Sequence, residues 1–302
     1  MRSFEIGVVL ITGQYGPDRV TVRWSELRSM AVQAEALGFD TVWSPDELVW
    51  RLPKGPPEGF WDGVAMAGAI AAVTPTVAVG TWVMSALHRN AGIIAKAAET
   101  LDEISAGRFV FGLGAGHAWP GQARTFGLPE DHIFDRFEDA LQVIVPLLRD
   151  GRADHEGRWH IARDLPQVPV GPRPGRIPLM IGGNGPRAQR LAVRHAEIWS
   201  GYPDERSHVD EYRPRLESLE AICAELGRDP TTIGRSAGVQ VKPLERGADP
   251  SGAWITGDPE AIADAIRSFR EAGCTRVEIM LRPCSVEALD ALGPVLERVR
   301  TD

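Results

Sequence analysis

The sequence predicts an α/β chain folded as one (β/α)8 TIM barrel with insertions on its rim. Short β-rich runs alternate with amphipathic helical stretches in eight successive units, and such regular alternation is typical of a parallel sheet. The chain has 302 residues, of which 43% are hydrophobic, so it can bury a large core. Because no change of composition marks a linker, we expect one domain over residues 1–302, and a closed barrel rather than a doubly wound sheet.

Eight strands are predicted where apolar, often β-branched residues cluster between turn-forming residues. In chain order they are Phe4–Leu10, Thr41–Ser44, Thr76–Val83, Arg108–Leu113, Ile177–Ile181, Ala196–Ser200, Ile233–Lys242 and Val277–Leu281. The first run contains Glu5 and is not followed by a small-residue cleavage site, so it is predicted to be a strand and not a signal peptide.

A helical stretch with 3.6-residue apolar spacing follows each strand. The clearest helices are Trp24–Leu37, Asp62–Ala72, Ala91–Ile104, Asp135–Leu148, Val209–Leu226 and Pro259–Ala272. Glycine favours the backbone conformation that ends a helix. A glycine follows four of these helices: Gly38, Gly107, Gly227 and Gly273. Two longer irregular segments rich in Pro, Gly and charge, Gly151–Arg176 and Leu244–Gly257, are expected to be rim insertions.

The charge balance and the cysteines limit the class of protein. With 33 basic and 41 acidic residues the net charge is −8, which argues against nucleic acid or an anionic membrane as the main partner. No apolar run approaches the roughly 20 residues of a membrane span. Cys223, Cys274 and Cys284 are too few and too scattered for a disulfide framework or a metal site. We therefore expect a cytoplasmic protein without a bound metal.

Polar residues follow the predicted strands at the end where barrel enzymes place their active sites. The segment "SPDELVW" after strand 2 offers Asp46 and Glu47, which are adjacent and so are expected to point in opposite directions. Strand 3 ends in "GTWVMSALHR", with Ser85 and His88, and strand 4 ends in "GLGAGHAWP", with His117. Aromatic residues lie beside them, which suits a flat, partly polar ligand.

The segment "IPLMIGGNGPRAQRLAVRHAEIW" places a glycine-rich turn, Gly182–Gly185, between a buried strand and a helix. Such a turn leaves backbone N–H groups accessible at a helix N-terminus, where phosphate binds well. Arg187 supports this hypothesis, because a cation in the first turn of a helix is disfavoured unless an anion lies there. The alternative is a tight turn with a solvent-facing arginine.

A second glycine turn, "FGLGAGH", contains Gly114 and Gly116. It does not match the dinucleotide-binding pattern, because His117 stands where the third glycine would be and no helix begins there. Small residues here either allow a ligand ring to approach the backbone or fit a crowded turn.

Five segments in this order resemble the luciferase-like monooxygenase family of flavin- and deazaflavin-dependent oxidoreductases: "GFDTVWSPDE", "VAVGTWVM", "AKAAETLDEISAGRFVFGLGAG", "FDRFEDALQVIVPLL" and "PLMIGGNGPRAQRLAVRHAEIWS". The resemblance extends from Phe4 to about Leu296. It implies a (β/α)8 barrel that binds coenzyme F420 or FMN without a covalent link, a non-prolyl cis peptide at Trp82–Val83, and a homodimer.

The resemblance also assigns residues. Asp46 matches the acidic residue that the deazaflavin branch places near the cofactor. The phosphate-binding turn corresponds to Gly182, Gly183, Asn184, Gly185 and Arg187. The positions that line the ring correspond to Trp82, Val83, Ser85, Gly114 and Gly116. The carboxylates of the F420 tail need cations, for which Arg89, Arg187 and Arg190 are available.

Two positions depart from the family's sugar-phosphate dehydrogenases. Glu47 stands where they carry a catalytic histidine, and His117 stands where they carry a glutamate. We therefore do not expect the same dehydrogenase chemistry for this chain. The histidine that luciferase-type members keep after strand 2 is absent, so light emission is not expected.

The predicted activity is transfer of a hydride between coenzyme F420 and a small organic substrate. The cofactor carries the hydride, so the protein needs to orient the substrate and exchange a proton. The candidates for exchanging that proton are His117, Glu47 and His88. His117 comes first because imidazole titrates at about pH 6.5, close to neutrality. Two alternatives stay open, an FMN-dependent monooxygenase that uses O2 and a barrel that binds flavin without catalysis.

Overall fold

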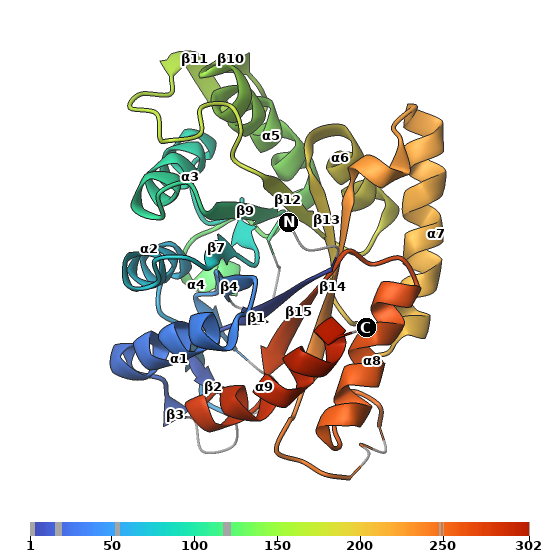
Figure 1. Cartoon of the computed structure of the whole chain (residues 1–302). Coiled ribbons are helices and arrows are strands. Elements are labelled where there is room, and N and C mark those ends of the chain that lie inside the picture. The colour runs from blue at the N-terminus through green and yellow to red at the C-terminus, as the bar shows by residue number, and fades with distance from the viewer. Residues whose placement is uncertain are drawn as a thin grey trace. The chain divides into compact units, whose positions relative to one another are not determined.

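Strands and helices alternate along the chain (Figure 1). The computed structural model describes residues 4–15, 20–51, 55–116, 122–247, 249 and 251–301. Within these residues eight strands are each followed by a helix: β1 (Glu5–Val9) by α1 (Trp24–Leu37), β4 (Thr41–Ser44) by α2 (Gly63–Val73), β7 (Ala78–Thr81) by α3 (Ala91–Ile104), β9 (Phe109–Gly114) by α5 (Ile133–Asp150), β12 (Leu179–Gly182) by α6 (Pro186–His195), β13 (Ile198–Gly201) by α7 (Val209–Leu226), β14 (Gly234–Val241) by α8 (Pro259–Glu271), and β15 (Arg276–Leu281) by α9 (Val286–Thr301). The order is that of a (β/α)8 barrel, which confirms the predicted fold class.

Shorter elements lie between these pairs. They are β2 (Gln14–Tyr15), β3 (Val20–Thr21), β5 (Val49–Trp50), β6 (Glu58–Gly59), β8 (Met84–Ser85), α4 (Gln122–Thr125), β10 (Arg152–Glu156), β11 (Ile161–Pro166) and the 3-10 turn η1 (Pro230–Thr232). The eight main strands and the clearest helices begin and end within two residues of the predicted positions. Glycine accounts for much of this agreement, since Gly38 and Gly227 end α1 and α7 in the left-handed conformation.

The chain forms two units, which are described separately. Unit 1 comprises Met1–Ile11, Arg23–Trp43 and Met180–Asp302, and unit 2 comprises Thr12–Val22 and Ser44–Leu179. The single-domain boundary of residues 1–302 stays a prediction.

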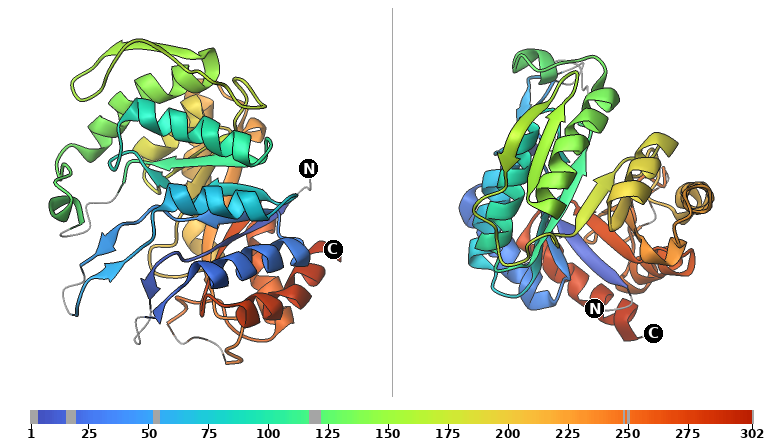
Figure 2. Two further views of the ribbon diagram at one scale, coloured as in Figure 1. Left: turned by 90° about the vertical axis from the view of Figure 1, so that its left-hand side faces the viewer. Right: turned by 90° about the horizontal axis from the view of Figure 1, so that it is seen from above.

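Unit 1 is built on parallel strands in the order β12-β13-β14-β15-β1-β4. In β1, Gly7 lies opposite Glu278 of β15 and Thr41 of β4. Helix α9 packs against α8 and α1, and Figure 2 shows these helices side by side. Strands buried on both faces explain the near-continuous apolar runs in the sequence.

A polar cluster lies inside unit 1, among buried strand residues. Glu278 is fully buried, and its carboxylate accepts hydrogen bonds from Arg276 Nε (2.5 Å), Ser236 Oγ (3.2 Å) and the Trp43 indole. Arg276 also pairs with Glu5 at 3.0 Å. A Cβ built on Gly7 would clash with both Glu278 Oε2 and the Trp43 indole, so glycine at this strand position makes room for the buried carboxylate.

Unit 2 contains β7, β9 and β8 as parallel neighbours, and α5 packs against α3. The segment Gly151–Arg176, predicted to be irregular, instead contains the antiparallel pair β10–β11, which lies on α5 (Figure 2). Asp139 of α5 fastens it by accepting hydrogen bonds from Trp159 N (2.7 Å) and His160 N (3.0 Å). Charged side chains on the exposed face hid the strand pattern, because only small residues such as Ala153 and Ala162 are buried.

Replacement of Gly7 by Ala tests the close approach in unit 1. We expect the free energy of unfolding to fall by about 1–3 kcal/mol, because the added methyl displaces a carboxylate that its partners hold from several sides. Denaturant unfolding measures the change. Gly247→Ala is the control, since a Cβ there has nothing within 4 Å, and it is expected to change stability by less than about 0.5 kcal/mol. Equal stability of the two variants would contradict the packing argument.

Candidate active site

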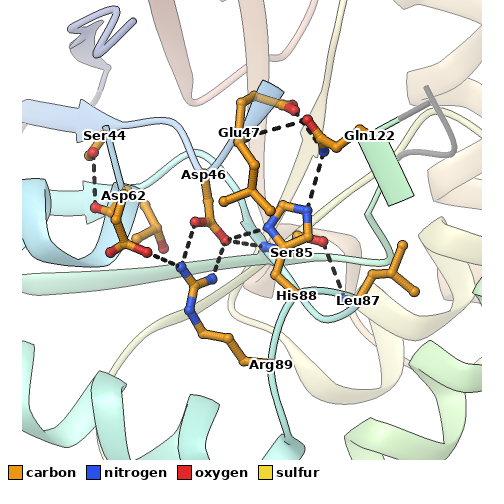
Figure 3. A network of polar contacts seen from close by, with 12 residues as sticks. Ser44, Asp46, Glu47, Asp62, Ser85, Leu87, His88, Arg89 and Gln122 are labelled. Atoms are coloured by element: carbon orange, nitrogen blue, oxygen red, sulfur yellow. Dashed lines mark hydrogen bonds and ion pairs between the residues drawn. The ribbon is translucent and has the colours of Figure 1, made fainter. Parts of the chain in front are cut away.

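Residues that follow strands β4 and β8 meet in unit 2 around one buried carboxylate (Figure 3). Asp46 is 3% exposed. Its Oδ2 accepts a hydrogen bond from Ser85 N at 2.9 Å and one from Arg89 Nη1 at 2.6 Å. Its Oδ1 accepts from Arg89 Nη2 at 3.0 Å. The guanidinium therefore grips the carboxylate with two parallel bonds, the strongest geometry for this pair.

Arg89 also connects this carboxylate to the start of α2. Its Nη2 lies 2.7 Å from Asp62 Oδ2. Asp62 is the N-cap of α2, and its other oxygen accepts from Ala65 N at 2.8 Å. Ser44 Oγ donates to Gly63 O at 3.0 Å beside it. The chain after β4, the loop after β8 and the first turn of α2 are thus held by one guanidinium.

The electrostatics of the pair favour the charged forms. Burial alone would raise the pKa of Asp46, but its contacts with His88 and Arg89 outweigh burial and hold the pKa below its ordinary value. Burial would lower the pKa of Arg89, and the contact with Asp46 raises it above the ordinary value instead. The site therefore contains a carboxylate and a guanidinium, both ionised at neutral pH.

Gln122 contacts two further side chains of the site, those of His88 and Glu47 (Figure 3). His88 lies between Asp46 and Gln122: its Nδ1 is 3.4 Å from Asp46 Oδ2, and its Nε2 is 3.3 Å from Gln122 Nε2. Glu47 Oε2 accepts from Trp50 Nε1 at 3.1 Å and from Gln122 Nε2 at 3.4 Å. Asp46 and Glu47 thus have different partners, as expected from their adjacency.

Close backbone contacts shape the ends of β8 and β9. Ser85 lies opposite Gly114 in the parallel ladder, and Ala86 N donates to Gly114 O at 2.9 Å. Gly116 has φ +94°, and a Cβ there would clash with the Ser85 hydroxyl. The second glycine turn is therefore crowded by the chain itself. The Trp82–Val83 peptide bond is cis, as the family resemblance implies.

The glycine turn of unit 1 leads from β12 into α6. Gly183 has φ +145°, and a Cβ there would lie 2.6 Å from Ala188 Cβ. Gly185 is the N-cap of α6, and a Cβ there would meet no atom within 4 Å. Asn184 points its amide at Tyr202, accepting from its N–H at 2.9 Å and donating to its carbonyl at 2.8 Å. A Cβ therefore has room at Gly185 and none at Gly183.

The predicted site residues are distributed as follows. Asp46, Ser85, His88 and Glu47 come together in unit 2, Gly114 and Gly116 lie against Ser85, and the residues of the glycine turn, with Arg187 exposed in the first turn of α6, belong to unit 1. His117 lies outside the described residues. Arg89 and Arg190, which were expected to face the F420 tail, have other partners: Arg89 binds Asp46, and Arg190 binds Glu225 through two bonds of 2.6 Å.

Gln122 was not predicted as a site residue. It lies on the short helix α4, which has no apolar period from which a site could be inferred. Asp62 carried a signal, because an aspartate before the apolar run of α2 is a typical N-cap. Its second role, as a partner of Arg89, depends on the fold.

The chain matches the model of the luciferase-like monooxygenase family over residues 4–249. It belongs to that family. An F420-dependent glucose-6-phosphate dehydrogenase of Microbacterium testaceum is 31% identical over 210 residues, 68% of this chain and 59% of that protein. One of Nakamurella multipartita is 34% identical over 61% of this chain and 52% of that protein. A 5,10-methylenetetrahydromethanopterin reductase of Archaeoglobus fulgidus is 27% identical over 71% of this chain and 58% of that protein. The family member described here thus spans between half and two thirds of these relatives.

Solved structures share the fold. An F420-dependent secondary alcohol dehydrogenase in complex with an F420-acetone adduct has a TM-score of 0.81 at 20% identity, over 99% of this chain and 100% of that one. The coenzyme F420 dependent tetrahydromethanopterin reductase of Methanopyrus kandleri has a TM-score of 0.80 at 18% identity, over 99% and 100% of the two chains. No helix among the described residues is long and apolar enough to cross a membrane.

Replacement of Asp46 by Asn tests the buried pair. We expect the free energy of unfolding to fall by about 3 kcal/mol at neutral pH, because the amide cannot accept all the hydrogen bonds that the carboxylate accepts. The folded pKa of Asp46 lies below the ordinary 3.8, so its contribution is present above that pH and is lost as the pH falls through the folded value. Unfolding from neutral pH down to about pH 3 measures both effects.

Asp62→Asn is the matched control for this variant. Asn is as good an N-cap as Asp, and the Asp62 side chain is 51% exposed. We therefore expect the free energy of unfolding to fall by less than about 1 kcal/mol. A smaller loss for Asp46→Asn than for Asp62→Asn, or a difference between wild type and Asp46→Asn that grows on acidification, would contradict this account.

Proposed function

We propose that this protein is an oxidoreductase that transfers a hydride between coenzyme F420 and a small organic substrate. The observation that carries the proposal is the pair of relatives with 31% and 34% identity, both named F420-dependent glucose-6-phosphate dehydrogenases. Two segments of the chain support the proposal, and each is considered by itself.

The glycine turn of unit 1 fits a phosphate. Helix α6 begins with no side-chain cap and no acidic residue in its first turn, and Pro186 is its first residue. A helix start of this kind presents backbone N–H groups and a positive partial charge to an anion. In our proposal Gly182, Gly183, Asn184, Gly185 and Arg187 hold the phosphate of the cofactor.

The proposed ring site lies at the ends of β7, β8 and β9 in unit 2. The chain there contains the small residues Ser85, Gly114 and Gly116 and the cis peptide between Trp82 and Val83. Gly116 lets the chain pass against Ser85, which in turn is bonded to the Asp46 carboxylate. We propose that Trp82, Val83, Ser85, Gly114 and Gly116 line the ring, with Asp46 behind them.

When bound, coenzyme F420 supplies the atom that gives or takes the hydride. The chain's own residues orient the substrate and exchange its proton. Glu47 is partly exposed, and its Oε2 accepts two hydrogen bonds, as a carboxylate does. We propose that Glu47 accepts the proton of a substrate hydroxyl during oxidation and returns it during reduction. His88 is 3% exposed in its side chain, which favours a role in holding Asp46. The role of His117 stays a proposal.

We also propose a homodimer in the cytoplasm. The dimer rests on the resemblance to the family. The location is supported by Cys223, Cys274 and Cys284, which are buried free thiols, the state expected in a reducing compartment. Light scattering of the purified protein measures the assembly.

The choice of cofactor is tested by titrating the purified protein with coenzyme F420 and, separately, with FMN. We expect F420 to bind more tightly, and we expect turnover of an alcohol or carbonyl substrate to change its absorbance. FMN carries the same type of phosphate as coenzyme F420, so the phosphate site alone cannot produce a preference for one of the two cofactors. Tighter binding of FMN, with O2 consumption, would replace this function by the monooxygenase alternative, and binding without turnover would leave a flavin-binding barrel.

Gly185→Asp tests the phosphate position. The side chain enters open space and caps α6, so the variant is expected to fold with unchanged or higher stability. Its carboxylate lies where we place the phosphate, and we expect affinity for F420 to fall about tenfold or more. Gly185→Asn adds the same bulk without charge and is expected to bind more tightly than Gly185→Asp. Equal affinities for all three proteins would place the phosphate elsewhere.

A further inference from the structure

The orientation of the Gln122 amide is fixed by the backbone. Gln122 is 1% exposed, and its Oε1 accepts from Leu48 N at 3.3 Å and from Val49 N at 3.1 Å. A backbone N–H only donates, so the amide oxygen has to face these two groups, and the NH2 group has to face the other way. A flipped amide would set its own N–H groups against both backbone donors.

The NH2 group then determines where His88 carries its proton. Gln122 Nε2 is 3.3 Å from His88 Nε2, so this ring nitrogen accepts and carries no hydrogen. A neutral imidazole has its one proton on the other nitrogen, here Nδ1, which lies 3.4 Å from Asp46 Oδ2. The opposite tautomer would place N–H against N–H at Gln122 and a lone pair against a carboxylate at Asp46.

We infer that Gln122 is a positioning residue that holds His88 as the neutral Nδ1–H tautomer. The network contains three carboxylates, on Asp46, Glu47 and Asp62, and one guanidinium, on Arg89, so its net charge attracts a second positive charge. An imidazolium would need a hydrogen on Nε2, and that hydrogen would meet an NH2 group whose orientation two backbone bonds fix. The geometry of Gln122 therefore opposes the charge of its surroundings.

This arrangement has a consequence for the proposed function, on which this step rests. A neutral His88 faces the Asp46 carboxylate with one polarised N–H rather than a full positive charge, so Arg89 is the one cation among the described residues that holds this carboxylate. The neutral state also removes His88 from the groups that give a proton to the substrate. The same amide donates a hydrogen bond to the Glu47 carboxylate. Gln122 therefore orients the proposed acid–base group and also keeps the neighbouring His88 uncharged.

Gln122→Glu exchanges the donor for an acceptor and is the sharpest test. One carboxylate oxygen keeps the bonds from Leu48 N and Val49 N, and the other faces His88 Nε2. In 15N-histidine-labelled protein without cofactor, we expect wild-type His88 to show a protonated Nδ1 and an unprotonated Nε2 at neutral pH. In Gln122→Glu both nitrogens should be protonated. The chain has seven histidines, and the His88→Gln spectrum assigns the signal.

Gln122→Met is the second variant, because it keeps the volume and removes every hydrogen bond of the amide. In this variant the His88 Nε2 signal should move toward that of a protonated nitrogen at neutral pH, since no NH2 group then faces it. In turnover with F420, Gln122→Glu should lower kcat about tenfold and add an ionisation to the pH profile, with F420 affinity unchanged.

A protonated Nε2 in wild type, or the same proton positions in wild type and Gln122→Glu, would overturn the inference. Absence of F420 turnover in wild type, with the expected NMR result, would overturn the proposed function and leave the role of Gln122 in setting the tautomer.

Discussion

The candidate active site depends on the burial of the Asp46 carboxylate. Its side chain has no exposed surface, and removing a carboxylate from water is expensive unless its oxygens are bonded. Arg89 supplies two bonds and Ser85 N supplies a third. Each of these donors is consequently held in place, and the loop from Ser85 to Arg89 is held with them. The carboxylate acts here on the chain around it.

The network joins charged groups at its two ends through the neutral amide of Gln122, whose orientation is fixed. It runs from the partly exposed Glu47 through the buried centre to the N-cap of α2, in the order Glu47, Gln122, His88, Asp46, Arg89 and Asp62 (Figure 3). Backbone N–H groups of β5 and the preceding residue orient the amide, the amide orients the imidazole, and the imidazole faces the carboxylate. Hydrogen-bond direction, rather than charge alone, therefore decides the protonation of the centre.

Much of the fold could be predicted because it depends on local rules. The apolar period and the glycines that end α1 and α7 placed the elements within two residues. The hairpin β10–β11 was missed because its buried residues are small and its exposed residues are charged. The carboxyl ends of parallel strands also brought Asp46, Ser85 and His88 together, as barrel geometry requires.

The partners of these residues could not be predicted in the same way. Arg89 and Arg190 were expected to face an anionic ligand, but each is bound by a carboxylate that is distant in the sequence or on another helix. The same limit applies to Gln122, whose partners are 34 and 75 residues away. No sequence pattern encodes contacts of this kind, because they depend on which rim positions face each other after folding.

The affinity for coenzyme F420 across a double-mutant cycle tests most directly whether Asp46 acts through Arg89. The cycle compares wild type, Asp46→Asn, Arg89→Gln and the double variant by fluorescence titration. If the pair acts as one unit that holds the loop after β8, each single variant binds F420 more weakly and the double variant binds no worse than the weaker single variant. Additive losses, or wild-type affinity in Asp46→Asn, would contradict this account.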